Sequence, residues 1–244
     1  MNRSIVIFGA HPDDETFFAG GTIAKYADEG AHVTIVCGTR GERGATGNLC
    51  TVDELPARRE QELRDAAQIL GADVVFLDYE DQKLSAAPPN DIRLQLVKAI
   101  RETRPQVAIT FDPNGANLHT DHIGISRFAS DALAAAADPR WYADAGPPHS
   151  TPRLLWQSHI VVFELASTAN LPECPGTDFI IDVNRWWRTK EAALRAHRSQ
   201  VPGFGRLFFG KPNTEQILSI EAFRLGAGPP PSVRPSFDLF DGLA

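Results

Sequence analysis

Four short apolar runs divide the first half of the chain, and a stretch of polar and apolar residues at helical intervals follows each of them. The runs are SIVIFGA from Ser4, HVTIVCG from His32, DVVFLD from Asp73 and QVAITFD from Gln106. Continuous apolar runs of this length are typical of strands that are buried on both faces. Strand and helix therefore alternate four times, which predicts a parallel sheet covered by helices and joined by right-handed crossovers.

The stretches with helical spacing end at residues that commonly end helices. They are residues 20–30 closing at Gly30, 55–71 closing at Gly71, and 90–105 closing at Pro105. Glycine adopts the left-handed conformation that follows many helices, and proline cannot continue one. A further helix is expected at about 123–137.

The second half of the chain is patterned less regularly. We expect a turn-rich insertion at 138–153, strands at 154–165 and 177–183, a helix from Asn184 to Gln200, a strand at 215–226, and a proline-rich, solvated tail at about 227–244. No repeat or linker separates these parts, so we expect a single α/β domain of residues 1–244. Its sheet should be Rossmann-like and mostly parallel, with helices on both faces.

Composition narrows the class of protein. Hydrophobic residues make up 43% of the chain and charged residues 23%, which is ordinary for a globular domain and excludes disorder as its main state. The formal net charge of −7 argues against nucleic-acid binding, which needs clustered Lys and Arg. No apolar run approaches membrane-spanning length and the first ten residues lack the pattern of a signal peptide, so we expect no membrane span and a cytoplasmic location.

The cysteines do not indicate a disulfide scaffold or a zinc ribbon. Cys37, Cys50 and Cys174 are odd in number and far apart, which predicts thiols that are buried or idle. Composition leaves the oligomeric state open, a homo-oligomer included.

Polar clusters follow three of the four predicted strands of the first half. His11, Asp13, Asp14 and Glu15 follow the first; the segment TRGERG, residues 39–44, follows the second; DPNGANLHTDH, residues 112–122, follows the fourth. In an open parallel sheet, ligands bind beyond the carboxyl ends of the strands. The three clusters should therefore meet along one rim of the sheet.

Imidazole and carboxylate groups together are the ligands of a catalytic zinc ion, which uses three protein ligands and leaves a position for water. His11 and Asp14 are three residues apart, as are His119 and His122, and this spacing brings side chains to one side of a helical turn. Two such pairs facing each other would make a metal site. Spacing alone leaves open which acid of residues 13–15 binds metal, and whether His119 is a ligand or a proton donor.

Simpler explanations exist for each cluster. A His-Pro pair after a strand is usually a turn, and the acids of residues 13–15 would cap a helix, a role that fits Glu15 in particular. The other histidines, which are His32, His149, His159 and His197, lack a partner at ligand spacing. The sequence has no GxGxxG after its first strand, no GxxxxGK[ST], no GxSxG and no HExxH.

Taken together, these segments resemble the PIG-L/LmbE superfamily of zinc-dependent N-deacetylases, the group of GlcNAc-PI de-N-acetylase-like enzymes. The resemblance rests on AHPDDE, TRGERG, RREQELRDAAQILG, DPNG with a following HTDH, and KEAALRAHRSQ, in this order over about residues 4–225. It implies a hydrolase that removes an acetyl group from the amine of an N-acetylglucosaminyl-type small glycoconjugate.

The resemblance also implies a role for each residue of the two motifs. His11, Asp14 and His122 would be the zinc ligands, although Fe²⁺ also accepts such a set. Asp13 would be the general base, and His119 would be a protonated partner that stabilises the oxyanion and assists the departing amine. Asp121 would orient His119. A histidine near an acid keeps its proton more readily, which suits this role.

Substrate contacts are implied for Arg40, Arg59 and Asp81, which sit where the resembled enzymes place sugar-recognising groups, with Arg59 pairing to Glu62 or Glu42 as the alternative. Asn117 stands where some sugar-thiol deacetylases carry a tyrosine; asparagine donates a hydrogen bond but has no phenolic proton. The segment HRSQ, residues 197–200, matches a family segment, but we interpret it as a solvated helix end.

Other functions remain to be weighed. Amidases of thiol-sugar conjugates and antibiotic-pathway deacetylases share the same chemistry, and only a panel of substrates separates them. A binding module without catalysis would be expected to lack one of the acid, base or ligand positions, which are all filled here. A nucleotide-binding protein would need phosphate-cradling glycines.

Overall fold

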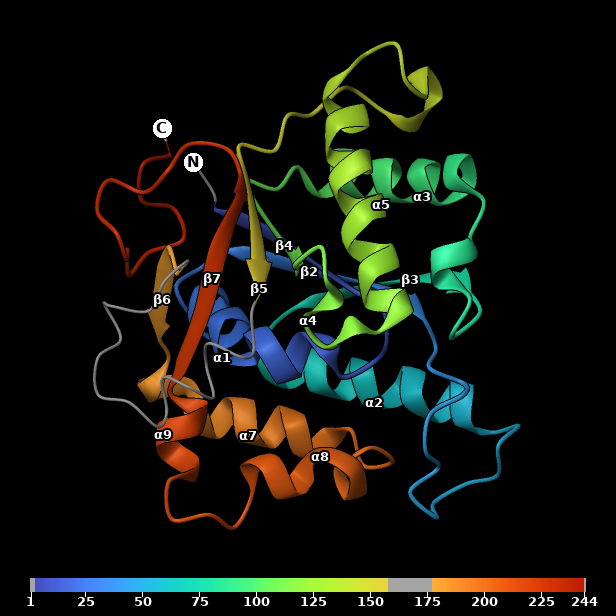
Figure 1. Cartoon of the computed structure of the whole chain (residues 1–244), viewed down its shortest axis with the longest axis vertical. Coiled ribbons are helices and arrows are strands. Elements are labelled where there is room, and N and C mark those ends of the chain that lie inside the picture. The colour runs from blue at the N-terminus through green and yellow to red at the C-terminus, as the bar shows by residue number, and fades with distance from the viewer. Residues whose placement is uncertain (1–2, 158–176, 244) are drawn as a thin grey trace.

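A seven-stranded mixed sheet with helices on both faces forms the computed structural model of the chain, which describes residues 3–157 and 177–243 (Figure 1). The strand order is β3-β2-β1-β4-β5-β7-β6. The first five strands run parallel; β7 is antiparallel to both β5 and β6. The predicted α/β class with a mostly parallel sheet is confirmed.

The strands of the first half lie where the apolar runs predict them. They are β1 (Ser4–Gly9), β2 (His32–Thr39), β3 (Asp73–Tyr79) and β4 (Val107–Phe111), followed by β5 (Arg153–Gln157), β6 (Phe179–Asp182) and β7 (Ile220–Ala227). β1 and β4 are buried along their whole length, as expected for central strands. The expectation of burial on both faces is wrong for β3, because this strand is at the edge of the sheet and Val75 is 36% exposed.

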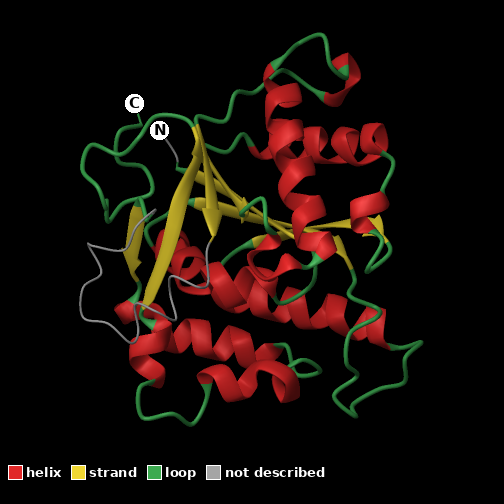
Figure 2. Ribbon diagram, in the orientation of Figure 1, coloured by secondary structure: helices red, strands yellow, loops and turns green. Residues whose placement is uncertain are grey.

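Two groups of helices cover the sheet (Figures 1 and 2). The helices are α1 (Asp14–Asp28), α2 (Leu55–Leu70), α3 (Pro89–Thr103), α4 (Gly115–Leu118), α5 (Thr120–Ala137), α7 (Trp187–Ala196), α8 (Val201–Phe208) and α9 (Thr214–Leu218). α1, α2 and α7 pack on one face, where Ile23, Leu63 and Ala193 belong to one buried cluster. α3 and α5 pack on the other, where Leu96 and Ala129 belong to a second.

Several elements of the second half differ from their predictions. The expected strand at 215–226 is instead helix α9 followed by β7, because the first apolar residues, Ile217 and Leu218, pack against α7 and α8 rather than in the sheet. Helix α8 is not predicted from the sequence pattern, because its proline and glycines are poor helix formers. Ser158–Leu165, the remainder of the expected strand after β5, lies outside the described residues.

The tail is only partly solvated. Residues 227–230 are exposed, as expected, but the chain returns to the core beyond Pro235, where Leu239 and Phe240 are buried. Arg153 holds this segment: its guanidinium donates to the carbonyl oxygens of Leu239 at 2.7 Å and Pro229 at 2.8 Å. Within the described residues, none of the helices combines the length and apolar character that crossing a bilayer requires.

Candidate metal centre and active site

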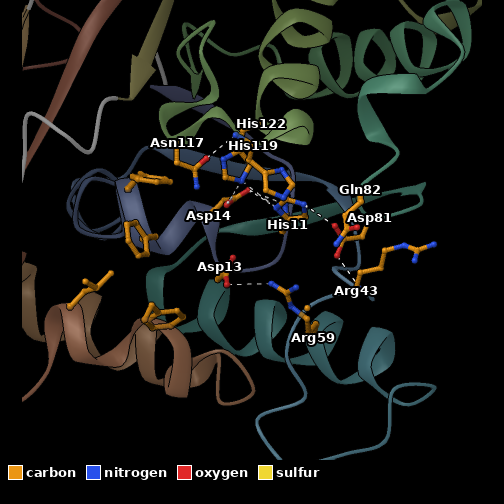
Figure 3. A pocket seen from close by; sticks show the side chains of 15 residues that line it. His11, Asp13, Asp14, Arg43, Arg59, Asp81, Gln82, Asn117, His119 and His122 are labelled. Atoms are coloured by element: carbon orange, nitrogen blue, oxygen red, sulfur yellow. Dashed lines mark hydrogen bonds and ion pairs between the residues drawn. The ribbon is translucent and has the colours of Figure 1, made fainter.

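Two loops that leave neighbouring central strands bring the histidine motifs together. The loop after β1 carries His11 and leads into α1 at Asp14, and the loop after β4 carries His119 and leads into α5 at Thr120. Both helices start earlier than the sequence pattern predicts, α1 by more than one turn and α5 by just under one turn. Their first turns carry polar site residues instead of core residues, so the apolar pattern begins only after them. The labelled side chains converge in Figure 3.

His11, Asp14 and His122 place two imidazole nitrogens and one carboxylate group in a compact triangle, with a different oxygen of Asp14 facing each histidine. His122 Nε2 lies 3.3 Å from His11 Nδ1 and 3.3 Å from Asp14 Oδ1, and His11 Nδ1 lies 3.8 Å from Asp14 Oδ2. Ligand atoms about 2.0–2.2 Å from a tetrahedral zinc ion are about 3.3–3.6 Å apart. These three side chains therefore fit a small divalent cation with little movement.

The other ring nitrogens of the two histidines face acceptors. His122 Nδ1 lies 3.1 Å from the carbonyl oxygen of Gly115, and His11 Nε2 lies 3.1 Å from Asp81 Oδ1 and 3.3 Å from Asp121 Oδ2. Such partners take the N–H of each ring and leave the facing nitrogen free to bind metal. Phe111 stacks on His122 at 3.9 Å and 6° between planes, which fixes that ring from its other side.

Burial, charges and hydrogen bonds shift the pKa values of Asp14 and His11 in opposite directions. Burial alone would raise the pKa of Asp14, but the charges and hydrogen bonds of His122 and His11 outweigh it and lower that pKa well below the usual range. Asp14 Oδ2 also accepts the backbone N–H groups of Ala10 and His11, both at 2.8 Å. For His11, burial lowers the pKa, but hydrogen bonds to Asp121 and Asp81 and the charge of Asp14 raise it to about 10.

Asp13 lines a cavity together with His11, His119 and His122, and it has a strained backbone, with φ at 129°, outside the usual range for a residue with a side chain. Its N–H donates to Glu15 Oε2 at 3.1 Å, and its carboxylate lies 3.3 Å from Arg59 Nη2. Burial raises the pKa of Asp13 to about 6; the charge of Arg59 opposes that shift and the charge of Asp14 adds to it. A carboxylate of this kind can exchange protons near neutral pH.

His119 is the N-cap of α5, and its Nδ1 accepts the backbone N–H of Asp121 at 3.2 Å. This contact leaves Nε2 to carry the ring proton. The ring lies 4.8 Å from the rings of both His11 and His122, and a nitrogen of each of the three lies within 4.8 Å of the others. Burial and the charges of the other two histidines lower the pKa of His119, so the expectation that it keeps its proton more readily is wrong.

Asp121 contacts a different histidine from the expected one. Its buried carboxylate lies against His11 and accepts the N–H of Gln82 at 2.6 Å, while only its backbone N–H reaches His119. Asp121 Oδ1 is buried without a hydrogen-bond partner among the described residues. The carboxylate thus orients His11, and the backbone orients His119.

The expected substrate contacts have separate placements. Arg40 pairs with Glu60 and Asp78 and lies outside the main cavity, so its expected contact is not supported by the structure. Arg59 lines the cavity, but it is buried and donates to the carbonyl oxygens of Gly41 and Pro12 in addition to its contact with Asp13. It pairs with neither Glu42 nor Glu62 at hydrogen-bond distance.

Asp81 and Asn117 both line the cavity, and both also support the histidines. Asp81 contacts His11 and accepts the N–H of Arg43 at 3.0 Å. Asn117 Oδ1 accepts the N–H of His119 at 3.1 Å. The chain before His119 is folded tightly, with positive φ at Ala116 and Leu118, which turns Asn117 toward the cavity.

The cavity has a volume of about 580 Å³ and includes residues that the sequence did not reveal. Arg43 and Gln82 belong to it, as do four apolar residues: Phe17, Phe18, Phe204 and Leu207. Phe17 and Phe18 were predictable once α1 is known to start at Asp14, because one helical turn then separates them from the ligand. Phe204 and Leu207 were not, since α8 itself escaped prediction.

Half of the segment HRSQ is buried, so its interpretation as a solvated helix end is wrong for His197 and Ser199, whereas Arg198 is exposed as expected. His197 and Ser199 are fully buried; His197 Nε2 lies 3.0 Å from Glu15 Oε1, and Ser199 donates to Glu62. Burial lowers the pKa of His197, but the charge of Glu15, its hydrogen bond and the charge of Asp13 together outweigh burial and raise that pKa. Glu15 is therefore a buried partner of His197, and it also accepts the N–H of Asp13, the N-cap residue of α1, in agreement with the capping role expected for it.

Comparison with known proteins gives the family. The model of the PIG-L family, described as GlcNAc-PI de-N-acetylase, matches residues 6–133. The 1D-myo-inositol 2-acetamido-2-deoxy-alpha-D-glucopyranoside deacetylase of Thermobifida fusca is 35% identical over 98% of this chain and 99% of its own length.

Solved structures agree on the fold. N,N'-diacetylchitobiose deacetylase from Pyrococcus horikoshii has a TM-score of 0.72 at 24% identity, covering 91% of this chain and 83% of its own. A 4-carboxy-2-hydroxymuconate hydratase from Pseudomonas putida has a TM-score of 0.68 at 22% identity, covering 93% and 97%. The same fold thus supports more than one reaction. The family match and the full-length relative show that this chain belongs to the PIG-L family.

Proposed function

We propose that the protein is a metal-dependent N-deacetylase acting on N-acetylglucosaminyl-type small glycoconjugates. One observation carries this proposal: a triangle of two imidazole nitrogens and a carboxylate borders a cavity that Asp13 and His119 also line. Hydrolysis of an amide needs an activated water, a base and an oxyanion donor in one place. The name of the full-length relative supports the same reaction class.

His11 Nδ1, Asp14 and His122 Nε2 would hold the metal ion. We propose Zn²⁺, which suits two imidazoles and one carboxylate, with Fe²⁺ as the alternative. A bound divalent ion supplies Lewis acidity, which makes water a stronger acid and an amide carbonyl a better electrophile.

Asp13 is the proposed general base. Its carboxylate is held by Arg59 and borders the cavity, and a pKa of about 6 leaves it ionised at neutral pH. It takes a proton from the attacking water as the new C–O bond forms. That proton can later pass to the amine nitrogen when the C–N bond breaks, leaving acetate and a free amine.

His119 is the proposed oxyanion donor. With Nδ1 accepting from the backbone of Asp121, its Nε2–H is available to a negatively charged oxygen even when the ring is neutral. Its lowered pKa favours this neutral form. To donate a proton to the departing amine, the His119 imidazole must first become protonated. The negative charge that develops on the nearby oxygen would favour this protonated form.

Arg43, Asp81, Gln82 and Asn117 are the proposed polar contacts to the substrate, since all four line the cavity beside the histidines. Arg59 is reassigned to positioning Asp13. Asp81 has a double role, because one oxygen is directed to His11 and the other to the backbone of Arg43.

The test is hydrolysis of a panel of N-acetylated amino sugars, with metal analysis of the same sample. We expect release of acetate in proportion to bound metal. His119→Ala should lower kcat about 10²- to 10³-fold with metal retained, as for loss of one oxyanion donor. Asp13→Asn should lower kcat by a similar factor or more. Arg40→Met is the control, because Arg40 lies outside the cavity, and it should change neither kcat nor the metal content. Full activity in His119→Ala would refute its role.

A further inference from the structure

The walls of the cavity differ in character on its two sides. Arg43, Arg59, Asp81 and Gln82 provide charged and amide groups, whereas α1 and α8 provide Phe17, Phe18, Phe204 and Leu207. In Figure 3, Arg43, Asp81 and Gln82 lie on the far side of His11 from the ribbons of α1 and α8. The metal-binding triangle is therefore between a polar wall and an apolar wall.

The apolar wall is built from packed side chains. The ring of Phe17 lies 4.7 Å from that of Phe18, 4.7 Å from that of Phe208 and 6.2 Å from that of Phe204, all near edge-to-face. Phe208 is 3% exposed and belongs to the small core between α7, α8 and α9. Such packing holds the wall in place. Leu207 is left 37% exposed at its edge.

This wall is larger than an acetyl group or the face of one sugar ring requires. A sugar ring typically offers one apolar face to one aromatic ring, and an acetyl group offers one methyl. Four apolar side chains from two helices, bordering a cavity of about 580 Å³, leave apolar surface that only an apolar group removes from water.

We propose that the natural substrate carries an apolar substituent, alkyl or aryl, close to the scissile amide, and that Phe17, Phe18, Phe204 and Leu207 bind it. This inference rests on the proposed deacetylase function and narrows its substrate class. The substituent belongs either to the acyl side of the amide, as a chain longer than acetyl, or to the amine side, as an apolar aglycone of the sugar.

Two substrate series separate these sources. One varies the acyl chain of glucosamine amides from acetyl to butyryl to hexanoyl, and the other varies the aglycone of N-acetylglucosamine from methyl to butyl to hexyl. We expect kcat/KM to rise about two- to fourfold per buried methylene in one series. The series that rises identifies the side, and kcat/KM that stays level or falls in both would overturn the inference.

Variants test whether the wall is responsible. Leu207→Gln and Phe204→Ser should flatten the rising series, so that the ratio of kcat/KM for the longest substrate to that for the shortest falls toward one. Ile69→Gln is the matched control, because Ile69 is on helix α2, is 41% exposed and lies outside the cavity. A rise that persists unchanged in both wall variants would contradict the assignment.

A binding measurement separates this inference from the proposed function. Methyl, butyl and hexyl glucosaminides have a free amine and cannot be deacetylated, so calorimetric titration of the metal-loaded protein reports binding without catalysis. A Kd that falls with chain length and no longer does so in Leu207→Gln supports the wall for an apolar aglycone, even if no amide is hydrolysed. Hydrolysis of the panel with level series in all assays would keep the function and refute the wall.

Discussion

At the residue scale, two neighbouring acids with opposite pKa shifts divide the work of the site. The pKa of Asp14 is lowered mainly because His122 and His11 outweigh its burial, whereas burial raises the pKa of Asp13 to about 6. One acid therefore stays ionised to bind a cation, and its neighbour can exchange a proton near neutral pH.

This difference predicts the pH profile of the enzyme. Because Asp13 must be ionised to act as a base, kcat/KM should fall as the pH decreases through about 6. The positive charge of a bound ion favours the carboxylate and can move this limb lower, but not higher. The rate profile is measured from pH 4.5 to 9. An acid limb with its midpoint above pH 7 would contradict Asp13 as the base.

Arg59 provides a second test of the same assignment. Its charge lowers the pKa of Asp13, so Arg59→Met should move the acid limb to higher pH. Arg40→Met is the matched control, because Arg40 pairs with Glu60 and Asp78 outside the cavity. The acid limb of the kcat/KM profile should stay at the same pH in this variant. A melting curve for each variant checks that the fold is retained.

Residues within recognisable motifs can be identified from the sequence, whereas the direction of a side chain that follows a tight turn cannot. Spacing marked the two histidine motifs but left the metal-binding acid and the role of His119 open, and only the family resemblance selected His11, Asp14 and His122 as a set. Arg43 was missed and Arg40 was chosen in its place, because Gly41, with φ at 63°, turns the chain between them. The side chains after such a turn cannot be placed from spacing alone.

At the element scale, α7 is tied to the sheet by a buried ion pair that the sequence did not suggest. Lys190 Nζ donates to Glu221 Oε1 on β7 at 2.6 Å, and Glu221 also accepts the N–H groups of Gly21 at 2.8 Å and Thr22 at 2.6 Å. The Lys190 and Glu221 side chains are 3% and 0% exposed. One carboxylate thereby joins α1, α7 and β7.

Replacing Lys190 should leave the buried carboxylate of Glu221 without its positively charged partner. Lys190→Met is expected to lower the free energy of unfolding by about 3–5 kcal/mol in urea titrations. The control is Arg195→Met on the same helix, whose pair with Glu191 is exposed and is expected to contribute less than about 1 kcal/mol. Equal effects for the two variants would contradict the special role of burial.

Elements with regular patterning were predictable, whereas those set by tertiary contacts were not. The first four strands and α2 agree with their apolar periodicity and with the glycine after Leu70. α9 was misread as strand because Ile217 and Leu218 are apolar in either structure, and only packing against α7 and α8 selects the helix. α8 is similar, since one proline and two glycines among its eight residues lower its helix propensity.

At the scale of the whole molecule, the site lies where the order of the strands changes direction. β1 has β2 on one side and β4 on the other, so the chain builds one half of the sheet and then returns to build the second. Loops that leave adjacent strands toward opposite sides separate there and form a crevice. The two histidine motifs are carried by the loops after β1 and β4, which explains how segments about 110 residues apart meet.

The C-terminal segment should matter to stability far from this crevice. Deleting residues 236–244 would expose the surface covered by Leu239 and Phe240 and remove the Leu239 carbonyl from Arg153. Since each large apolar side chain contributes about 1.5–3 kcal/mol when buried, we expect a fall in melting temperature of several degrees or more. Val233→Ser, at a 68% exposed position of the same tail, should leave it unchanged.

The imidazole of His11 joins three segments at once, since Asp14 begins α1, Asp81 follows β3 and Asp121 lies in the first turn of α5. A cation bound at His11 Nδ1 should therefore strengthen the contacts that His11 Nε2 makes with the carboxylates of Asp81 and Asp121. Amide hydrogen exchange at Gln82, whose N–H donates to Asp121, should slow when metal is added, although Gln82 is distant from the ligands in sequence. The loop after β3 would then report metal loading without touching the ion.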